Sequence, residues 1–183
     1  MRVGLIADTH IPEAGPELPR QVFKALQGVD LILHAGDLHV LHVLDWLEPI
    51  APVLCARGNG DARYPTSPKR PGVPDDPRIK DSHVLELEGF VLGMTHGFPG
   101  PDEPAWNNLH KPMHFYFGRR VDIIVCGDTH VELITEKDGV LMVNPGSPTL
   151  PRNLLPQLGT VGLLELRPGF RRAEVVKLRE VHL

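Results

Sequence analysis

Three stretches of this sequence share one pattern: VGLIADTH at residues 3–10, LILHAGDLH at residues 31–39 and IIVCGDTH at residues 123–130. In each, a short apolar run leads directly into an Asp-x-His triplet. Such runs are typical of the buried strands of a parallel sheet. Because ligands bind beyond the carboxyl ends of parallel strands, we expect the three triplets to converge in space although they lie far apart in the chain.

The segments between these runs predict an α/β fold. Apolar residues recur at helical spacing over residues 18–26, and the glycine that follows them is a helix stop signal. A second helix is expected at 40–47 and a further strand at 52–56. Together with strands at 3–7 and 30–35, these elements give a β-α-β-α-β order. This order implies a parallel sheet with crossover helices.

The second half of the chain is mostly β. Strands are expected at residues 83–87, 90–95, 121–126, 131–136, 140–143, 160–166 and 170–178, and one helix is expected at 105–117. Asp138-Gly139 and Pro168-Gly169 are turn signals between neighbouring strands. A two-layer β-sandwich core flanked by helices, an α-β-β-α architecture, accommodates both halves. We therefore predict a single domain over residues 1–183.

Residues 61–80 differ in character from the rest. Prolines recur at every third residue from Pro65 to Pro77, with Arg and Lys side chains between them. Proline clusters of this kind indicate loop structure. Two interpretations are open at this point: an irregular surface loop whose charges are solvated, or a basic lip that meets an anionic substrate.

The composition is that of a soluble globular protein, with 42% hydrophobic and 23% charged residues. A formal net charge of −4 without a basic run argues against a dedicated binding surface for duplex nucleic acid. No apolar run approaches the roughly 18 residues that a membrane span needs, and the first residues lack the apolar stretch of a signal peptide. Cys55 and Cys126 lie in apolar runs and indicate reduced core thiols, so we expect a cytoplasmic protein.

Histidine is frequent, with 10 residues, and the triplets point to a use for it. Carboxylate oxygen and imidazole nitrogen together suit divalent ions such as Mn²⁺, Fe²⁺, Ni²⁺ or Zn²⁺. Alternate residues at a strand end share a side, so both groups of a triplet can point at one ion. Two further fragments follow expected strands: RGNGD at residues 57–61, which contains Asn59 and Asp61, and MTHG at residues 94–97, which contains His96.

Taken in order, these fragments resemble the calcineurin-like metallophosphoesterases. The matching set is Asp8-x-His10, Gly36-Asp37, Gly58-Asn59-x-Asp61, Thr95-His96-Gly97 and Gly127-Asp128-Thr129-His130. The later stretch VNPGSPTLPR, at residues 143–152, is similar to a segment of the family's small prokaryotic phosphodiesterase branch. The similarity spans about residues 2–152, and several motifs in the family's order make it specific.

The resemblance implies a site for two divalent metal ions. By position, Asp8, His10 and His130 would bind the first ion, Asp37 would bridge both ions, and Asn59 and His96 would bind the second. In such sites the ions generate a bridging hydroxide that attacks phosphorus in line with the leaving group. Mn²⁺ is the favoured ion, with Ni²⁺, Fe²⁺ or Zn²⁺ as alternatives. The residues that the resemblance assigns to catalysis are Asp37, Asn59 and His96.

Two positions depart from the family pattern. Asp128 stands where the family usually has a His that binds the second metal. We include Asp128 among the metal ligands, although its shorter, charged side chain favours a harder, oxygen-richer second site; if it does not reach, that site is weak or empty. At Gly60, many relatives have a His that protonates the leaving group. Without it, a leaving group of low pKa or a metal-bound water as the acid is needed.

Other residues near these motifs have less specific interpretations. His39 is expected at the surface or in support of the ligands, and His34 either orients a ligand or is a satisfied core histidine. His110 and His114, four residues apart on an expected helix, indicate a solvated face. A turn or supporting role is expected for Asp61. A backbone-shaping role is expected for Asn144, Gly146 and Ser147, with contact to the phosphate as the alternative.

The resemblance predicts a metal-dependent phosphoesterase and favours a phosphodiesterase that acts on a small phosphoester substrate. A phosphomonoesterase or a nucleotide phosphohydrolase is an alternative within the enzymes. From a different class, the alternative is a metal-poor, catalytically decayed scaffold that acts through protein–protein contacts, as a retromer subunit of this fold does. Relatives are often dimers, so a homodimer is left open. The aromatic content of 5% argues against a large nuclease.

Overall fold

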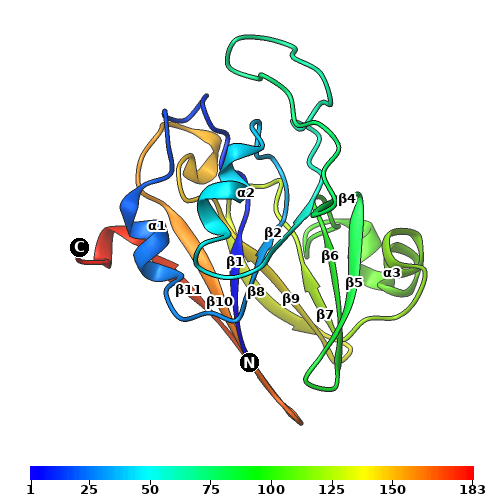
Figure 1. Cartoon of the computed structure of the whole chain (residues 1–183). Coiled ribbons are helices and arrows are strands. Elements are labelled where there is room, and N and C mark those ends of the chain that lie inside the picture. Colours follow the sequence, from blue (N-terminus) through cyan, green and yellow to red (C-terminus); the bar gives the residue numbers. More distant parts are fainter.

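The computed structural model describes residues 1–183 and has four layers (Figure 1). Two β-sheets pack face to face, and helices cover the outer face of each sheet. The predicted α-β-β-α sandwich is confirmed.

The first sheet has six strands in the order β11-β10-β1-β2-β3-β4. They are β1 (Arg2–Ile6), β2 (Leu31–His34), β3 (Val53–Ala56), β4 (Ile79–Lys80), β10 (Thr160–Arg167) and β11 (Phe170–Lys177). Strands β1 to β4 run parallel, so their carboxyl ends share one edge. The register pairs Ile6 with His34 and His34 with Cys55, which brings the ends of the first three strands level.

The second sheet has five strands in the order β5-β6-β7-β9-β8. They are β5 (Ser82–Leu87), β6 (Phe90–Thr95), β7 (Ile123–Val125), β8 (Glu132–Lys137) and β9 (Val140–Pro145). Strands β6, β7 and β9 are parallel, whereas β5 and β8 are antiparallel hairpin partners of β6 and β9. The second sheet therefore also gathers the carboxyl ends of its central strands at one edge.

The core between the sheets comes from alternation along the strands. Val3, Leu5 and Ala7 join the apolar cluster between the sheets, where Met94 of β6 also lies, whereas Ile6 belongs to the cluster under the helices. All five side chains are fully buried. Burial on both faces explains why these strands are continuous apolar runs rather than alternating ones.

The helices are α1 (Arg20–Ala25), α2 (His42–Leu47) and α3 (His110–Phe117), and 3-10 turns lie at Pro104–Asn108, Pro151–Asn153 and Leu178–Glu180. Val22 of α1 and Leu44 of α2 pack on the outer face of the first sheet. Met113 and Phe117 of α3 pack on the outer face of the second. None of these helices has the length and apolar character needed to cross a bilayer.

Several predicted elements differ from the structure, and three of them show why. The helix expected at 18–26 begins only at Arg20, because Pro19 before it is extended, with ψ of 139°. The helix expected at 105–117 is divided into the turn Pro104–Asn108 and α3. The loop expected at 61–80 ends in β4, which pairs with β3 and buries Ile79.

Candidate metal centre

The residues singled out from the sequence lie at the carboxyl edges of the two sheets. Asp8, Asp37 and Asn59 follow β1, β2 and β3 of the first sheet, and His96 and His130 follow β6 and β7 of the second. Because the sheets are stacked, the two edges face each other and bring these side chains to one place. Asp8, His10, Asp37, His96 and His130 are all buried.

The Asp-x-His triplets share an unusual backbone. The Asp and the His of each adopt the left-handed conformation, with φ of 54° and 47° in the first triplet, 58° and 65° in the second, and 73° and 58° in the third. Residues other than glycine rarely occupy this region, although Asp and His do so more often than most. Such strain persists only where the surroundings enforce it, and it concentrates at functional sites.

The first group of candidate ligands is Asp8, His10 and His130, whose ligand atoms lie within 4.8 Å of one another. The Nδ1 atom of His130 lies 2.8 Å from the backbone oxygen of Leu150. If Nδ1 donates its proton there, the lone pair of Nε2 is free on the side that faces Asp8, 4.0 Å away. Burial lowers the pKa of His130, which favours this neutral form.

Asp37 lies between two histidines from different sheets. Its Oδ2 atom is 3.2 Å from Nε2 of His10, and its Oδ1 atom is 3.5 Å from Nε2 of His96. Oδ1 also accepts a hydrogen bond of 2.7 Å from the backbone N–H of Gly60. Each carboxylate oxygen therefore faces a different half of the site.

The second group of candidate ligands surrounds Nε2 of His96. Oδ1 of Asn59 lies 2.9 Å from this atom and Oδ1 of Asp128 lies 3.4 Å from it. The other ring nitrogen, Nδ1, is 2.7 Å from the backbone oxygen of Ala35, which fixes the ring and turns Nε2 into the site. Asp128 thus reaches the second half of the site, although about half of its side chain is exposed.

The pKa values of the site residues are shifted because several carboxylates lie close together in a buried site. Burial raises the pKa of Asp8 to about 7. Burial also acts to raise the pKa of Asp37, but the neighbouring imidazole of His10, 3.2 Å away, and the charge of His96 outweigh it and lower that pKa below its ordinary value. For His96, burial is outweighed by Asp128 and the other carboxylates, and its pKa rises to about 9. The site therefore stabilises positive charge among its acids.

Two buried polar atoms of this cluster indicate whether metal ions fit the site. Oδ2 of Asp8 and Nε2 of His10 are buried and have no hydrogen-bond partner. An unsatisfied buried polar atom is costly, and a bound cation removes this cost. The donor set of carboxylate oxygens and imidazole nitrogens suits Mn²⁺, Fe²⁺, Ni²⁺ or Zn²⁺. The residues present therefore fit divalent ions.

Asp61 holds the loops that carry these ligands. Its Oδ2 atom accepts hydrogen bonds of 2.9 Å from the backbone N–H groups of Asp37 and Gly58, and Oδ1 accepts one of 2.9 Å from His39. Asp61 is 2% exposed. The supporting role expected for it agrees with these contacts.

The segment after β9 braces the site from the other side. The side-chain amide of Asn144 donates hydrogen bonds to the backbone oxygen of Gly127 and to Thr129, and the hydroxyl of Ser147 donates to the backbone oxygen of Asp8 at 2.7 Å. Asn144 also accepts a hydrogen bond from the N–H of Gly146. These contacts agree with a backbone-shaping role.

The remaining histidines differ in environment. His34 is a satisfied core histidine, since Nε2 lies 3.2 Å from the Thr9 hydroxyl and Nδ1 accepts a hydrogen bond from the N–H of Gly36. His110 and His114 are exposed and stack on each other along α3. His39 is not at the surface: it is 0% exposed, and burial lowers its pKa to about 4.

Glu13 was missed by sequence reasoning. Its Oε2 atom lies 3.4 Å from Nδ1 of His39 and 3.9 Å from Nδ1 of His10, and the guanidinium of Arg70 lies 3.3 Å from the same oxygen. Two imidazoles and one guanidinium therefore lie around a single carboxylate, and the guanidinium donates hydrogen bonds to it. The only signal in the sequence was its position three residues after His10.

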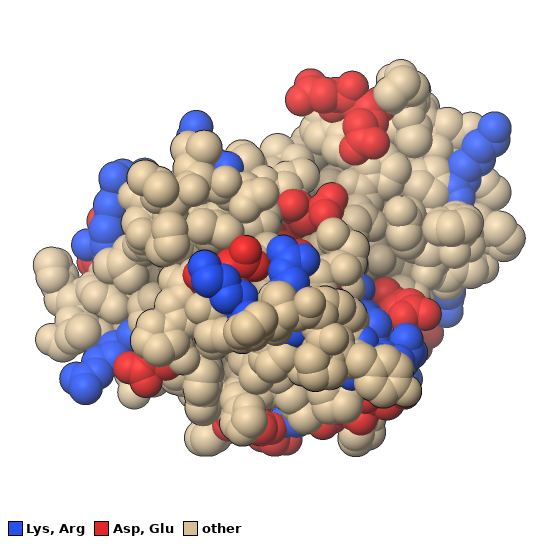
Figure 2. Space-filling view, turned by 90° about the horizontal axis from the view of Figure 1, so that it is seen from above, with Lys and Arg blue, Asp and Glu red and all other residues tan.

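Arginines of the proline-rich loop at 61–80 form ion pairs with acidic residues inside and outside the loop. Arg63 pairs with Asp75, Arg70 with Glu13, and Arg78 with Asp45, Asp76 and Glu48. Seen from above, basic side chains lie beside acidic ones on the face from which this loop rises (Figure 2). The structure thus favours an ion-paired surface loop over a basic lip.

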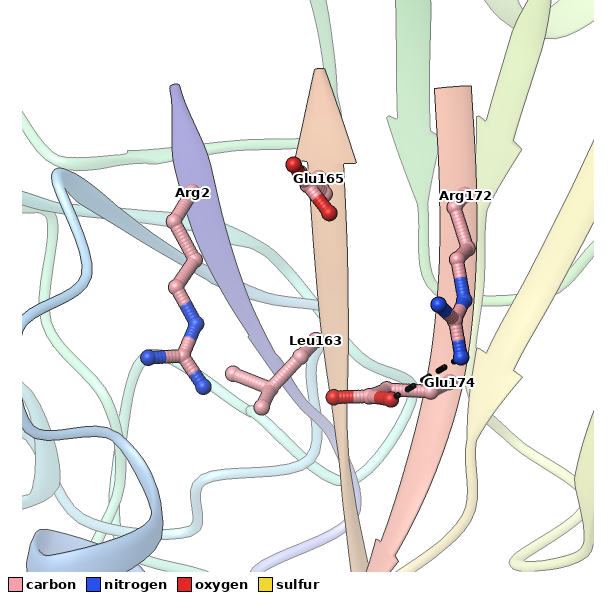
Figure 3. A pocket seen from close by; sticks show the side chains of 5 residues that line it. All are labelled: Arg2, Leu163, Glu165, Arg172 and Glu174. Carbon is pink, nitrogen blue, oxygen red and sulfur yellow. Dashed lines mark ion pairs between the residues drawn. The ribbon is translucent and has the colours of Figure 1, made fainter. Parts of the chain in front are cut away.

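A hollow of about 240 Å³ lies on the first sheet, away from these ligands (Figure 3). It is lined by Arg2, Leu163, Glu165, Arg172 and Glu174. Arg2 is at the amino end of β1, whereas Asp8 lies beyond its carboxyl end. The hollow has two basic and two acidic side chains and no histidine, so it offers no comparable chemistry.

Comparisons with known proteins agree with the fold described above. Residues 1–169 match the model of the calcineurin-like phosphoesterase superfamily domain. A probable metallophosphoesterase of Methanothermobacter thermautotrophicus is 39% identical over 154 residues, which cover 83% of this chain and 80% of that protein. A phosphodiesterase of Methanocaldococcus jannaschii is 25% identical over 167 residues, or 90% and 93% of the two chains. The structure of Vps29 from Entamoeba histolytica with Zn²⁺ has a TM-score of 0.69 at 22% identity, covering 97% of this chain and 99% of that one.

Proposed function

Because the chain belongs to the calcineurin-like phosphoesterase superfamily, we propose that it is a phosphodiesterase that works with two divalent cations at the site described above. The observation that carries this proposal is the position of Asp37, whose two oxygens face His10 and His96 on opposite sides. The phosphodiesterase of Methanocaldococcus jannaschii supports the choice of diesters over monoesters.

The ligands divide into two sets around Asp37. The first set is Asp8, His10 and His130, and the second is Asn59, His96 and Asp128, with Asp37 shared between them. When bound, two such ions supply a nucleophile from water at neutral pH and neutralise charge on the phosphoryl oxygens. We propose Mn²⁺ as the preferred ion, with Ni²⁺, Fe²⁺ or Zn²⁺ as alternatives, because the donors mix oxygen and nitrogen.

The protein groups fix the ligands before substrate arrives. Ala35 and Leu150 hold the rings of His96 and His130 through their Nδ1 atoms, and Asp61 holds the backbone of Asp37. Groups that are already in place need no reorganisation when charge develops on phosphorus. This rigidity is the contribution of the chain itself to the rate.

The leaving group receives no proton from residue 60, because Gly60 has no side chain. The imidazole beside it, that of His39, is fully buried and cannot meet a substrate oxygen without movement. We therefore propose that good substrates have leaving groups that depart without protonation.

The test is hydrolysis of bis(4-nitrophenyl) phosphate by the purified protein with added Mn²⁺ or Ni²⁺. Asp37→Ala should remove activity and lower the metal content found by elemental analysis. Glu174→Ala is a matched control, because it removes a carboxylate from the 240 Å³ hollow on the first sheet, away from the candidate ligands. This variant should keep its activity and its metal content. Equal activity in Asp37→Ala and the unaltered protein would exclude the assigned site.

The same assays distinguish the proposed phosphodiesterase from two alternatives, a phosphomonoesterase and a scaffold. A phosphomonoesterase would hydrolyse 4-nitrophenyl phosphate faster than the diester. A scaffold that works by protein contacts would take up no Mn²⁺ on exhaustive titration and hydrolyse neither ester. The buried, unsatisfied atoms of Asp8 and His10 favour metal uptake over the scaffold.

A further inference from the structure

A cleft of about 570 Å³ opens directly beside the second half of the candidate metal site. Asn59 and His96 form part of its wall, so the cleft is continuous with the place where phosphorus would lie. Its volume falls within the range of sites that bind small organic molecules. A phosphoryl group held by Asn59 and His96 would occupy only the end of this cleft, which leaves room for a larger substituent.

Another part of the wall is aromatic. Phe115 and Tyr116 of α3 line the cleft, with ring centroids 5.0 Å apart and nearly perpendicular planes. The Phe115 side chain is 81% exposed, whereas its neighbours Met113 and Phe117 are buried in the core. The helix is therefore firmly packed, and Phe115 presents an uncovered ring to whatever enters the cleft.

The backbone that carries this ring is held in place. Helix α3 lies beside β5 and β6 (Figure 1), and the Ser82 hydroxyl at the start of β5 donates a hydrogen bond of 2.8 Å to the backbone oxygen of Tyr116. An aromatic side chain has few rotatable bonds, so it provides contact area to a flat ligand at little cost in conformational entropy.

The polar residues of the cleft indicate the charge and the hydrogen-bonding groups of a ligand that would fit it. Arg57 is already bound, with donors to the backbone oxygens of Asp61 and Val73 and to the carboxylate of Asp75. Asp81 is exposed and forms no ion pair, so its carboxylate accepts hydrogen bonds but repels a second phosphate. The cleft therefore suits an uncharged substituent that has a planar ring and donor groups.

We propose that this cleft binds a nucleoside as one ester group of the phosphodiester, with its base stacked on Phe115 and its hydroxyl or amino groups near Asp81. This inference rests on the proposed function, because the phosphate must be held at the neighbouring metal site. It narrows the substrate class to nucleotide diesters.

The test compares three probes by calorimetric titration of the Mn²⁺-loaded protein: inorganic phosphate, ribose 5-phosphate and adenosine 5′-monophosphate. The base should make adenosine 5′-monophosphate bind roughly tenfold more tightly than ribose 5-phosphate, as expected for one base stacked on one aromatic ring. Phe115→Ala and Phe115→Leu should both abolish this difference and leave the affinity for ribose 5-phosphate unchanged. Phe115→Trp should retain it.

Phe170→Ala is the matched control, since Phe170 is a partly exposed ring at the turn between β10 and β11, outside the cleft. It should change none of the three affinities. Equal affinity of the two sugar phosphates in the unaltered protein would overturn the inference, as would equal losses for both in Phe115→Ala. If phosphate binds with Mn²⁺ but the base adds nothing, only the nucleoside site is wrong. If no probe binds and no ester is hydrolysed, the proposed function is wrong and this inference fails with it.

Discussion

A β-carbon on residue 60 would overlap Nε2 of His39 and lie 3.0 Å from Oδ1 of Asp37. His39 is fully buried and has no hydrogen-bond partner on either ring nitrogen. Its ring centroid lies 4.2 Å from that of His10, and the two ring planes are tilted by 54°. The glycine and the histidine are therefore coupled: the imidazole of residue 39 fills the space from which a side chain at residue 60 would start. This explains in steric terms why the chain has Gly60.

Gly60→Ala should destabilise the protein by about 1–3 kcal/mol, because the added carbon has no room beside His39. His39→Ala should relieve most of that cost, so that the double variant is more stable than the sum of the two single effects predicts. Urea unfolding of all four proteins measures this coupling. Gly100→Ala is the control, since the nearest atom to a carbon there is 4.0 Å away. A purely additive result would contradict the steric coupling.

The side chain of Asp61 provides a second prediction. Asp61→Asn replaces an acceptor that serves three N–H groups with an amide that must turn a donor toward at least one of them. The expected loss is about 1–3 kcal/mol in unfolding free energy and a roughly 10- to 100-fold weaker Mn²⁺ affinity.

Asp122→Asn is a matched control for Asp61→Asn. Asp122 also accepts a backbone hydrogen bond, from Val91 at 2.8 Å, but at the start of β7, away from the ligands. It should affect stability only. If Asp61→Asn binds Mn²⁺ as tightly as the unaltered protein does, Asp61 has no role in positioning Asp37.

Sequence patterns predicted the parts of this molecule that depend on local order. Apolar runs identified β1, β2 and β7, and the family's order of motifs identified the residues that gather around Asp37. Both signals work because a buried strand and the residue that follows it are adjacent in the chain. The fold and the place of the candidate ligands followed from that adjacency.

Other features depend on contacts between distant segments and had no local signal. The carboxylate of Glu13 meets Arg70 only because the proline-rich loop folds back over it. His39 is buried because Gly60 leaves space for it, and β4 forms because β3 offers an open edge. The repeated left-handed backbone of the triplets likewise follows from bonds such as that from the N–H of Asp8 to the backbone oxygen of Gly36.

Asp128 provides a third prediction, on metal stoichiometry. Asp128→Ala should leave one tightly bound Mn²⁺ and weaken the second, because the altered side chain contacts only the His96 half of the site. Asp128→His, which restores the family's residue type, should bind two ions. Elemental analysis after dialysis measures both. Two tightly held ions in Asp128→Ala would show that the carboxylate is not a ligand.

The absence of a side chain on Gly60 predicts a strong dependence on the leaving group. Across a series of aryl phosphodiesters, log kcat should fall steeply as the pKa of the leaving phenol rises, since no protein acid protonates it. His39→Gln should leave this slope unchanged if the buried imidazole does not reach substrate. A shallow slope that becomes steep in His39→Gln would identify His39 as the acid instead.

The metal-free protein should lose stability as pH rises from 6.5 to 8.5. Burial acts to lower the pKa of His96, but Asp128, Asp37 and Asp8 outweigh it and raise that pKa from 6.5 to about 9. In this window the folded protein keeps a proton that the unfolded chain releases, so a rise in pH favours unfolding. Asp8, with its pKa near 7, acts in the same direction at the lower end. The expected contribution of His96 to this loss is about 2 kcal/mol.

Urea unfolding after treatment with a chelator, repeated across this pH range, measures that loss. His96→Gln should flatten the profile because the group that holds the extra proton is gone. The histidines with lowered pKa values, such as His130, act in the opposite direction at the lower end of this range, because the unfolded chain still binds protons there that the folded protein does not. With saturating Mn²⁺ the trend should reverse, since metal ions bind the deprotonated ligands and compete with protons. An unchanged slope in His96→Gln would show that the extra proton of the metal-free site is held elsewhere.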